Sequence, residues 1–270
     1  MTAPAHVVGY CSTKGGVGKS TTAFATAVAA AQQGLNVLAW DLDPSCWLAG
    51  ALGILDHPVT LTDVLSGQAQ LHEAIAISHL GIAVLVGGRR LKQVALSRQV
   101  MLDLREKLAP QADVVIVDTE GEDTKLPGVM EALDRICVPM PLDRLSAIVA
   151  SDTLHVAEEA GVLDRVGGLL ATNVKFRKDE PEDTEAREVY SNMRLLGIAY
   201  EHVMLGSKLW SRAASESEFP PPRLVELAVA LLQEIRERRA EPTRLSIWMH
   251  SYSRENRAKE LRHGRTGLTS

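Results

Sequence analysis

The chain has 270 residues, of which 46% are hydrophobic and 23% are charged, and its formal net charge is -5. This balance is typical of a folded globular protein and argues against a disordered chain or a generally basic nucleic-acid-binding surface. The three cysteines, Cys11, Cys46 and Cys137, form no CxxC pair, so neither a zinc site nor a disulfide framework is expected.

Two further patterns concern location. No apolar run reaches the roughly 20 residues that a transmembrane helix needs. The first apolar run is short and leads straight into a glycine-rich loop, so we recognise no signal peptide. Both patterns predict a cytoplasmic protein.

Short apolar runs alternate with stretches of helical spacing along most of the chain. Strands are expected at residues 6–12, 36–40, 81–86, 113–117, 135–139 and 167–171, and helices at 20–33, 60–65, 91–108 and 145–160. Gly34 is a natural end for the first helix. Because the strands are apolar throughout, both faces of their sheet must be covered. The predicted fold is a doubly wound α/β domain with a mostly parallel sheet and helices on both faces.

The C-terminal part of the chain is more polar. Residues 175–183 are charged and rich in turn formers, which predicts an exposed loop, whereas 223–239 has the apolar spacing of an amphipathic helix. We expect one domain at residues 1–240 and a helical, basic appendage at 241–270. The appendage has a two-turn apolar stripe followed by a basic run. The stripe is compatible with packing on the body, which we favour, with contact to DNA phosphates, or with a membrane surface.

A glycine-rich loop stands between the first strand and the first helix. Its three glycines allow the backbone to wrap around phosphate oxygens, and the start of the next helix presents further N–H groups. Lys19 can then reach the β- and γ-phosphates of a nucleotide, and the Ser20 hydroxyl can bind Mg²⁺. This setting predicts a P-loop for ATP with magnesium, built from Lys14, Gly15, Gly16, Val17, Gly18, Lys19, Ser20 and Thr21.

Carboxylates follow two of the other predicted strands. Asp41 and Asp43 alternate along an extended segment, so both can face the phosphate end of the sheet. Residues 114–117 are apolar and deliver Asp118, which is the pattern of a Walker B strand. We expect Asp118 to hold Mg²⁺, with Asp41 as a second candidate for the magnesium site. Glu120 begins a second switch loop, and we favour a non-catalytic role for it.

The loop also departs from the common GxxxxGK[ST] pattern, because Thr13 replaces the first glycine and Lys14 lies inside the loop. With the following DxDP segment, it resembles the KGGxGK[ST] motif of the ParA/MinD family of P-loop ATPases, and of plasmid-type ParA proteins in particular. The resemblance implies a homodimer that sandwiches ATP, in which Lys14 reaches the partner's phosphates. It also implies that Asp43 positions the attacking water, and that Asn173 contacts adenine. The family pattern continues with Gln and Gly, where this chain has Ser45 and Cys46.

The resemblance implies a slow, partner-stimulated ATPase that binds DNA non-specifically, associates with the nucleoid and positions a plasmid, chromosome or other cargo. A stimulating adaptor of the ParB type would be its partner. Candidate DNA contacts are the clustered arginines Arg236, Arg238, Arg239, Arg254 and Arg257. Two alternatives stay open: a MinD-like regulator that associates with membrane in the ATP state, and a P-loop enzyme with its own acceptor substrate.

Overall fold

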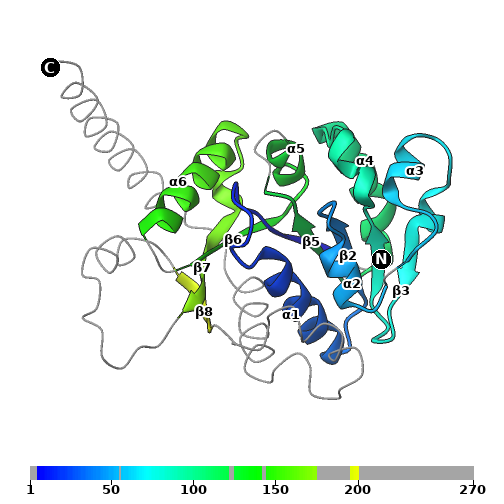
Figure 1. The fold of residues 1–270 in the computed structure, drawn as a ribbon, viewed down its shortest axis with the longest axis horizontal. Coiled ribbons are helices and arrows are strands. Elements are labelled where there is room, and N and C mark those ends of the chain that lie inside the picture. Colours follow the sequence, from blue (N-terminus) through cyan, green and yellow to red (C-terminus); the bar gives the residue numbers. More distant parts are fainter. Residues whose placement is uncertain (1–4, 55, 122–124, 142–143, 175–194, 201–270) are drawn as a thin grey trace, which may run out of the picture.

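The computed structural model describes residues 5–54, 56–121, 125–141, 144–174 and 195–200. They form one eight-stranded sheet in the order β3-β4-β2-β5-β1-β6-β7-β8 (Figure 1). The strands are β1 (His6–Tyr10), β2 (Val37–Leu42), β3 (Ile75–Ile77), β4 (Ala83–Val86), β5 (Val114–Thr119), β6 (Arg135–Pro141), β7 (Val166–Val174) and β8 (Leu195–Tyr200). Every pair is parallel except β3 with β4.

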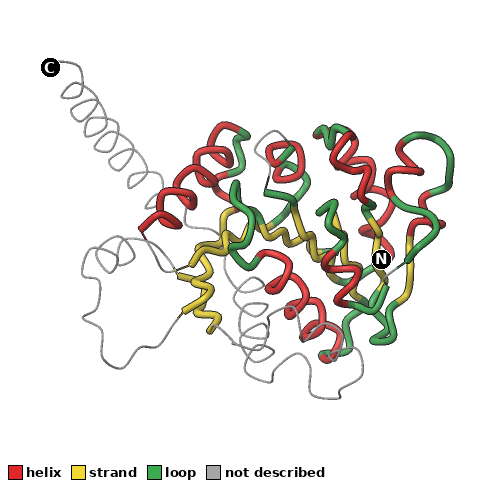
Figure 2. The backbone as a smooth tube through the Cα atoms, in the orientation of Figure 1, coloured by secondary structure: helices red, strands yellow, loops and turns green. Residues whose placement is uncertain are grey.

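Helices cover both faces of this sheet (Figures 1 and 2). The α-helices are α1 (Lys19–Gln32), α2 (Trp47–Ala51), α3 (Leu61–Leu65), α4 (Arg98–Leu108), α5 (Leu126–Met130) and α6 (Arg144–Glu159); the short 3₁₀ turns are η1 (Leu71–Ala74), η2 (Arg89–Gln93), η3 (Ala109–Gln111) and η4 (Leu163–Arg165). One core cluster joins α1 and α2 to one face, and a second joins α3, α4, α5 and α6 to the other. The predicted fold class is therefore confirmed.

The central strands are apolar on both faces because both faces are buried. Along β5, for example, successive residues alternate between the two clusters: Val115 packs with α4 to α6, and Ile116 packs with α1 and α2. The buried side chains of the central strands hold the carboxyl ends of β1, β2 and β5 in register. Tyr10 and Asp41 both lie opposite Asp118 in that register.

The ends of α1 follow from its glycines. The helix begins after Gly18, which has φ +97°, and Gly34 beyond its C-terminus has φ +78°. Both are left-handed conformations that glycine adopts without steric cost. The predicted stop at Gly34 is confirmed.

The structure corrects one predicted helix and adds elements that the sequence pattern did not indicate. The helix expected at 91–108 is divided: η2 ends at Gln93, and α4 starts only at Arg98, where the Ser97 side chain accepts a hydrogen bond from Val100 N (3.4 Å). The capping serine competes with helix formation in the preceding residues. Strands β3 and β8 and helices α2 and α5 were not predicted. Strand β3 and helices α2 and α5 have only three to five residues each, and segments this short carry little periodicity.

The expected loop at 175–183, the helix at 223–239 and the appendage at 241–270 lie outside the described residues. Within the described ranges, no helix combines the length and apolarity needed to cross a membrane.

Candidate functional site

The glycine-rich loop joins β1 to α1 at the carboxyl edge of the sheet. Lys14, Gly15 and Gly16 are exposed, whereas Val17 is buried beneath them. Gly16 has φ +75°, so the loop turns where a larger residue would be strained. The loop thus presents its backbone to solvent at the start of a helix, the arrangement that binds phosphate groups.

Thr13, which replaces the usual first glycine, anchors this loop to α6. Its backbone N–H donates to Thr153 Oγ1 (3.1 Å), and its hydroxyl lies within reach of Val149 O (3.4 Å). The departure from the common motif therefore has a structural function here. No sequence pattern indicates this contact, because Thr153 lies 140 residues further along the chain.

The two lysines of the loop are placed differently. Lys19 is 5% exposed, and its ammonium donates to Lys14 O across the loop (2.9 Å). Burial lowers the pKa of Lys19, while Asp118 and Asp43 nearby favour its charged form. The Lys14 side chain is exposed and makes no hydrogen bond or ion pair with the part of the chain that the structure describes. One cation thus lies within the site, and the other is accessible from outside the protomer.

Asp118 is fully buried at the end of β5, and neither carboxylate oxygen has a hydrogen-bond partner among the described residues. Burial raises its pKa well above the ordinary value, and the neighbouring Asp41 adds to this effect. The Ser20 hydroxyl and Lys19 oppose the shift. A buried, unpaired carboxylate close to a hydroxyl is a donor set suited to Mg²⁺, which binds oxygen ligands. The residues present therefore fit the metal that the loop predicts.

Asp41 lies beside Asp118 but has backbone partners of its own. Its carboxylate accepts hydrogen bonds from Ala49 N (2.7 Å) in α2 and from Asp43 N (3.3 Å). Burial raises the pKa of Asp41 to about 7, and these hydrogen bonds oppose the shift. Asp41 thus holds the turn after β2 against α2. Its predicted contact with magnesium stays a prediction.

The turn after β2 carries Asp43 and contains a strained residue. Asp43 is partly exposed, and its Oδ1 accepts from Ser45 N (2.8 Å). Cys46, at the end of the turn, has φ +53°, which is unusual for a residue with a side chain. This geometry holds the carboxylate of Asp43 close enough to Lys19 to influence its pKa.

Glu120 belongs to a charge cluster that the sequence did not reveal. Its carboxylate pairs with Lys125 Nζ (3.5 Å) and lies 4.0 Å from Lys92 Nζ. Lys125 Nζ also donates to Leu91 O (3.0 Å) and Lys92 O (2.9 Å). These contacts tie the segment after β5 to η2. Pairing with two lysines suits the non-catalytic role that we favoured for Glu120.

Gly121 packs directly on the glycine-rich loop. A Cβ atom at this position would lie 2.8 Å from Lys14 C and 2.9 Å from Gly15 N. The segment after β5 can approach the loop so closely because residue 121 has no side chain.

The structure brings most of the predicted site together. The loop, Ser20, Asp41, Asp43 and Asp118 meet at the carboxyl ends of β1, β2 and β5. Asn173 lies near the end of β7, which is separated from β1 by β6. The five arginines predicted to contact DNA lie outside the described residues.

Comparison with known proteins gives the chain's relatives. A family model described as the CobQ/CobB/MinD/ParA nucleotide binding domain matches residues 8–216. An uncharacterised ATP-binding protein of Methanocaldococcus jannaschii is 32% identical over 170 residues, which are 60% of this chain and 65% of that protein. The chain thus spans slightly less than two thirds of that relative's length. The chromosome partitioning protein ParA of Caulobacter vibrioides is 38% identical over 79 residues, 28% of this chain and 30% of that protein.

Among solved structures, the septum site-determining protein MinD of Pyrococcus horikoshii, in complex with Mg-ADP, resembles this chain with a TM-score of 0.70. The match covers 86% of this chain and 96% of that one, at 20% identity. At this identity the likeness shows a shared fold.

Proposed function

Because the chain belongs to the CobQ/CobB/MinD/ParA family of nucleotide-binding domains, we propose that it binds ATP with Mg²⁺ and hydrolyses it to ADP and phosphate. The observation that carries this proposal is the convergence of Lys19 and Asp118 at the glycine-rich loop. The two side chains lie close enough to influence each other's pKa, and Asp118 is buried without a hydrogen-bond partner among the described residues. The ATP-binding protein of M. jannaschii and the Mg-ADP complex of MinD support the same ligands.

Each residue of the proposed nucleotide site has a separate role. Backbone N–H groups of the loop bind the phosphates, and Lys19 exchanges its bond to Lys14 O for phosphate oxygens. Ser20 and Asp118 hold Mg²⁺, which neutralises charge on the phosphates when bound. Asp43 orients the attacking water. The protein supplies position and charge rather than a covalent intermediate.

The proposed cycle depends on a homodimer. Lys14 is exposed and has no partner in the described part of its own protomer, so it is available to reach a nucleotide bound by a second copy. We propose that ATP joins two protomers in this way and that hydrolysis separates them. The dimer would bind DNA without regard to sequence, associate with the nucleoid and position a cargo with a ParB-type adaptor. The partial match to the partitioning protein ParA of C. vibrioides supports this assignment.

The test is binding to non-specific double-stranded DNA at fixed salt, with ATP, with ADP and without nucleotide. The proposal expects binding only with ATP, an affinity that falls steeply as salt rises, and no binding by Lys19→Ala. Absence of DNA binding in every nucleotide state would overturn the positioning role on DNA. ATP-dependent binding to anionic liposomes in the same series would identify the MinD-like alternative instead.

A further inference from the structure

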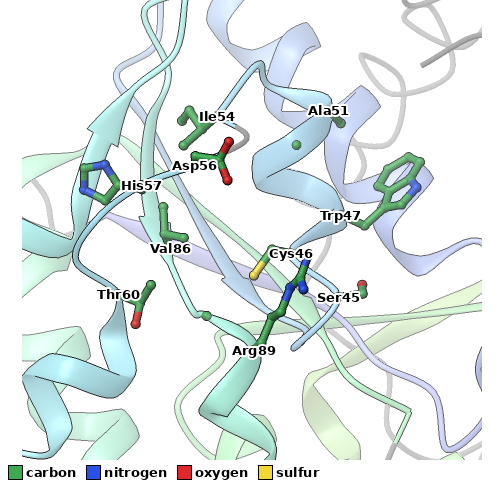
Figure 3. Close-up of a pocket in the computed structure, with 12 residues that line it drawn as sticks. Ser45, Cys46, Trp47, Ala51, Ile54, Asp56, His57, Thr60, Val86 and Arg89 are labelled. Carbon is green, nitrogen blue, oxygen red and sulfur yellow. The ribbon is translucent and has the colours of Figure 1, made fainter. Parts of the chain in front are cut away.

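A cavity of about 710 Å³ lies beside the turn after β2 (Figure 3). Its apolar walls include Trp47 and Ile54 on the α2 side and Val86 at the end of β4. Its size falls within the range of small-molecule sites, which join apolar walls to a few polar groups. The cavity is lined by residues that the proposed nucleotide site does not use.

Polar side chains also line the cavity. Cys46 and Arg89 lie close to each other on one side of it, and Asp56 and His57 lie on the other side (Figure 3). His57 is already engaged, because its Nε2 lies 2.9 Å from Glu73 O. Asp56 is exposed to solvent. Arg89 is therefore the cation that a ligand in this cavity would meet.

Arg89 differs from the arginines around it. Arg90 pairs with Asp63, Arg98 pairs with Glu131 (3.4 Å) and Arg105 pairs with Asp134 (2.7 Å). Arg89 has no carboxylate partner among the described residues, although its charge is near enough to lower the pKa of Cys46 against the larger effect of burial. An unpaired guanidinium beside apolar walls is suited to a carboxylate, sulfonate or phosphate group.

The cavity touches both segments that carry the switch carboxylates. Its lining includes Ser45, Cys46 and Trp47, and Ser45 N donates to the carboxylate of Asp43. Arg89 begins η2, whose carbonyl groups bind Lys125, the partner of Glu120. A ligand that contacts both Cys46 and Arg89 could therefore shift the position of Asp43 and of the Glu120 segment together.

We propose that this cavity is a second ligand site, which takes a small organic molecule with an apolar body and one anionic group. Arg89 binds the anionic group, and Trp47, Ile54 and Val86 contact the apolar body. Occupancy shifts the position of Asp43 and so changes the rate of ATP hydrolysis. Only this last effect rests on the proposed function, since binding itself needs no nucleotide.

The binding test uses 8-anilino-1-naphthalenesulfonate, an aromatic sulfonate, as the probe, without nucleotide. Cys46 reports on its location, because Cys46 is partly exposed, Cys11 and Cys137 are buried, and the chain has no other cysteine. We expect the probe to slow alkylation of Cys46 by iodoacetamide in proportion to its fluorescence titration. Unchanged alkylation at saturating probe would overturn the site.

Variants locate the anionic group. Arg89→Ala is expected to weaken probe binding about tenfold, as loss of a charged hydrogen bond would. Arg90→Ala removes the same charge from the next residue, outside the cavity, and should leave the affinity within about twofold. Equal weakening by the two variants would contradict the role of Arg89. Ala51→Phe, which fills the cavity from α2, should abolish protection of Cys46 while Arg89 is still present.

The effect on hydrolysis is measured separately, as phosphate release with and without the probe. A change in rate that Ala51→Phe removes would support coupling through Asp43. An unchanged rate with bound probe would overturn the coupling but leave the binding site intact. A protein that binds the probe but hydrolyses no ATP would refute the proposed function alone.

Discussion

Asp41 and Asp118 lie opposite each other on neighbouring strands, and both carboxyl groups are buried. Burial raises the pKa of Asp41 to about 7 and raises that of Asp118 as well. In the unfolded chain both would titrate near 4. The folded state therefore binds protons more tightly, so this contribution to stability is complete below about pH 4 and is lost as the pH rises through about 7.

The free energy of unfolding of the nucleotide-free protein should accordingly fall between pH 5 and pH 8. Asp118→Asn removes one of the two charges, so it should reduce this fall by on the order of 1–2 kcal/mol. Urea unfolding at several pH values measures the difference. Asp103→Asn, at an exposed position on α4, is the control and should follow the wild type. The same slope in Asp118→Asn and wild type would show that the buried pair does not titrate as inferred.

Without nucleotide, Asp118→Asn should raise the free energy of unfolding near pH 8 relative to the wild type. With Mg²⁺ and ATP, the same substitution should lower it relative to the wild type. Mg²⁺ and ATP should stabilise the wild type by mass action, and Asp118→Asn should lose most of that gain because the amide is a poor magnesium ligand. Relative to the wild type, the variant should therefore be more stable without ligand and less stable with it. A purely structural role for Asp118 would change stability in the same direction under both conditions.

Asp43 is expected to act on the chemical step rather than on binding. Asp43→Asn keeps an oxygen that can accept from Ser45 N, so the turn should be retained. We expect phosphate release to slow about 100-fold, with ATP affinity within about threefold of wild type. Asp103→Asn, at an exposed position on α4, serves as the matched control. A parallel loss of affinity and rate in Asp43→Asn would indicate a binding role instead.

The glycine-rich loop and the segment after β5 are in contact at Gly121. Gly121→Ala should push the two apart, because its Cβ would lie under 3.0 Å from the backbone of Lys14 and Gly15. ATP affinity, measured by fluorescence titration of a labelled nucleotide, should fall about tenfold or more. Gly128→Ala creates a closer clash, with its Cβ 2.3 Å from Leu96 O, away from the loop. It should lower stability while the folded protein keeps its ATP affinity.

The elements show which parts of this site a sequence can reveal. The strands β1, β2 and β5 were predictable because buried parallel strands are apolar throughout, and the loop because three glycines precede a lysine and a serine. Asp41, Asp43 and Asp118 could be placed at the site because each comes at or just after the carboxyl end of a predicted strand. The contacts of Thr13 with Thr153 and of Glu120 with Lys125 were not predictable, because they depend on how the helices and loops pack around the sheet. The backbone strain at Cys46 has no sequence signal either.

One protomer holds only part of the proposed catalytic arrangement. Lys19 lies inside the loop and bonds to Lys14 O, but the Lys14 side chain points to solvent and is unpaired in the described part of the chain. Removal of Lys14 should therefore leave the protomer's own nucleotide site intact. Its effect should be confined to the association of two copies.

Lys14→Ala should bind ATP within about threefold of wild type but remain a monomer in sedimentation with ATP, where the wild type forms a dimer. Lys19→Ala should also stay monomeric, but because it no longer binds ATP. The comparison separates bridging from binding, since only the Lys14 variant is loaded with nucleotide and still monomeric. If Lys14→Ala dimerises with ATP as well as the wild type, the bridging role is wrong. If Lys14 bridges the two protomers, its removal must prevent dimerisation with ATP. Any ATP-dependent DNA binding would otherwise have to come from a single protomer or from a dimer held together by other residues.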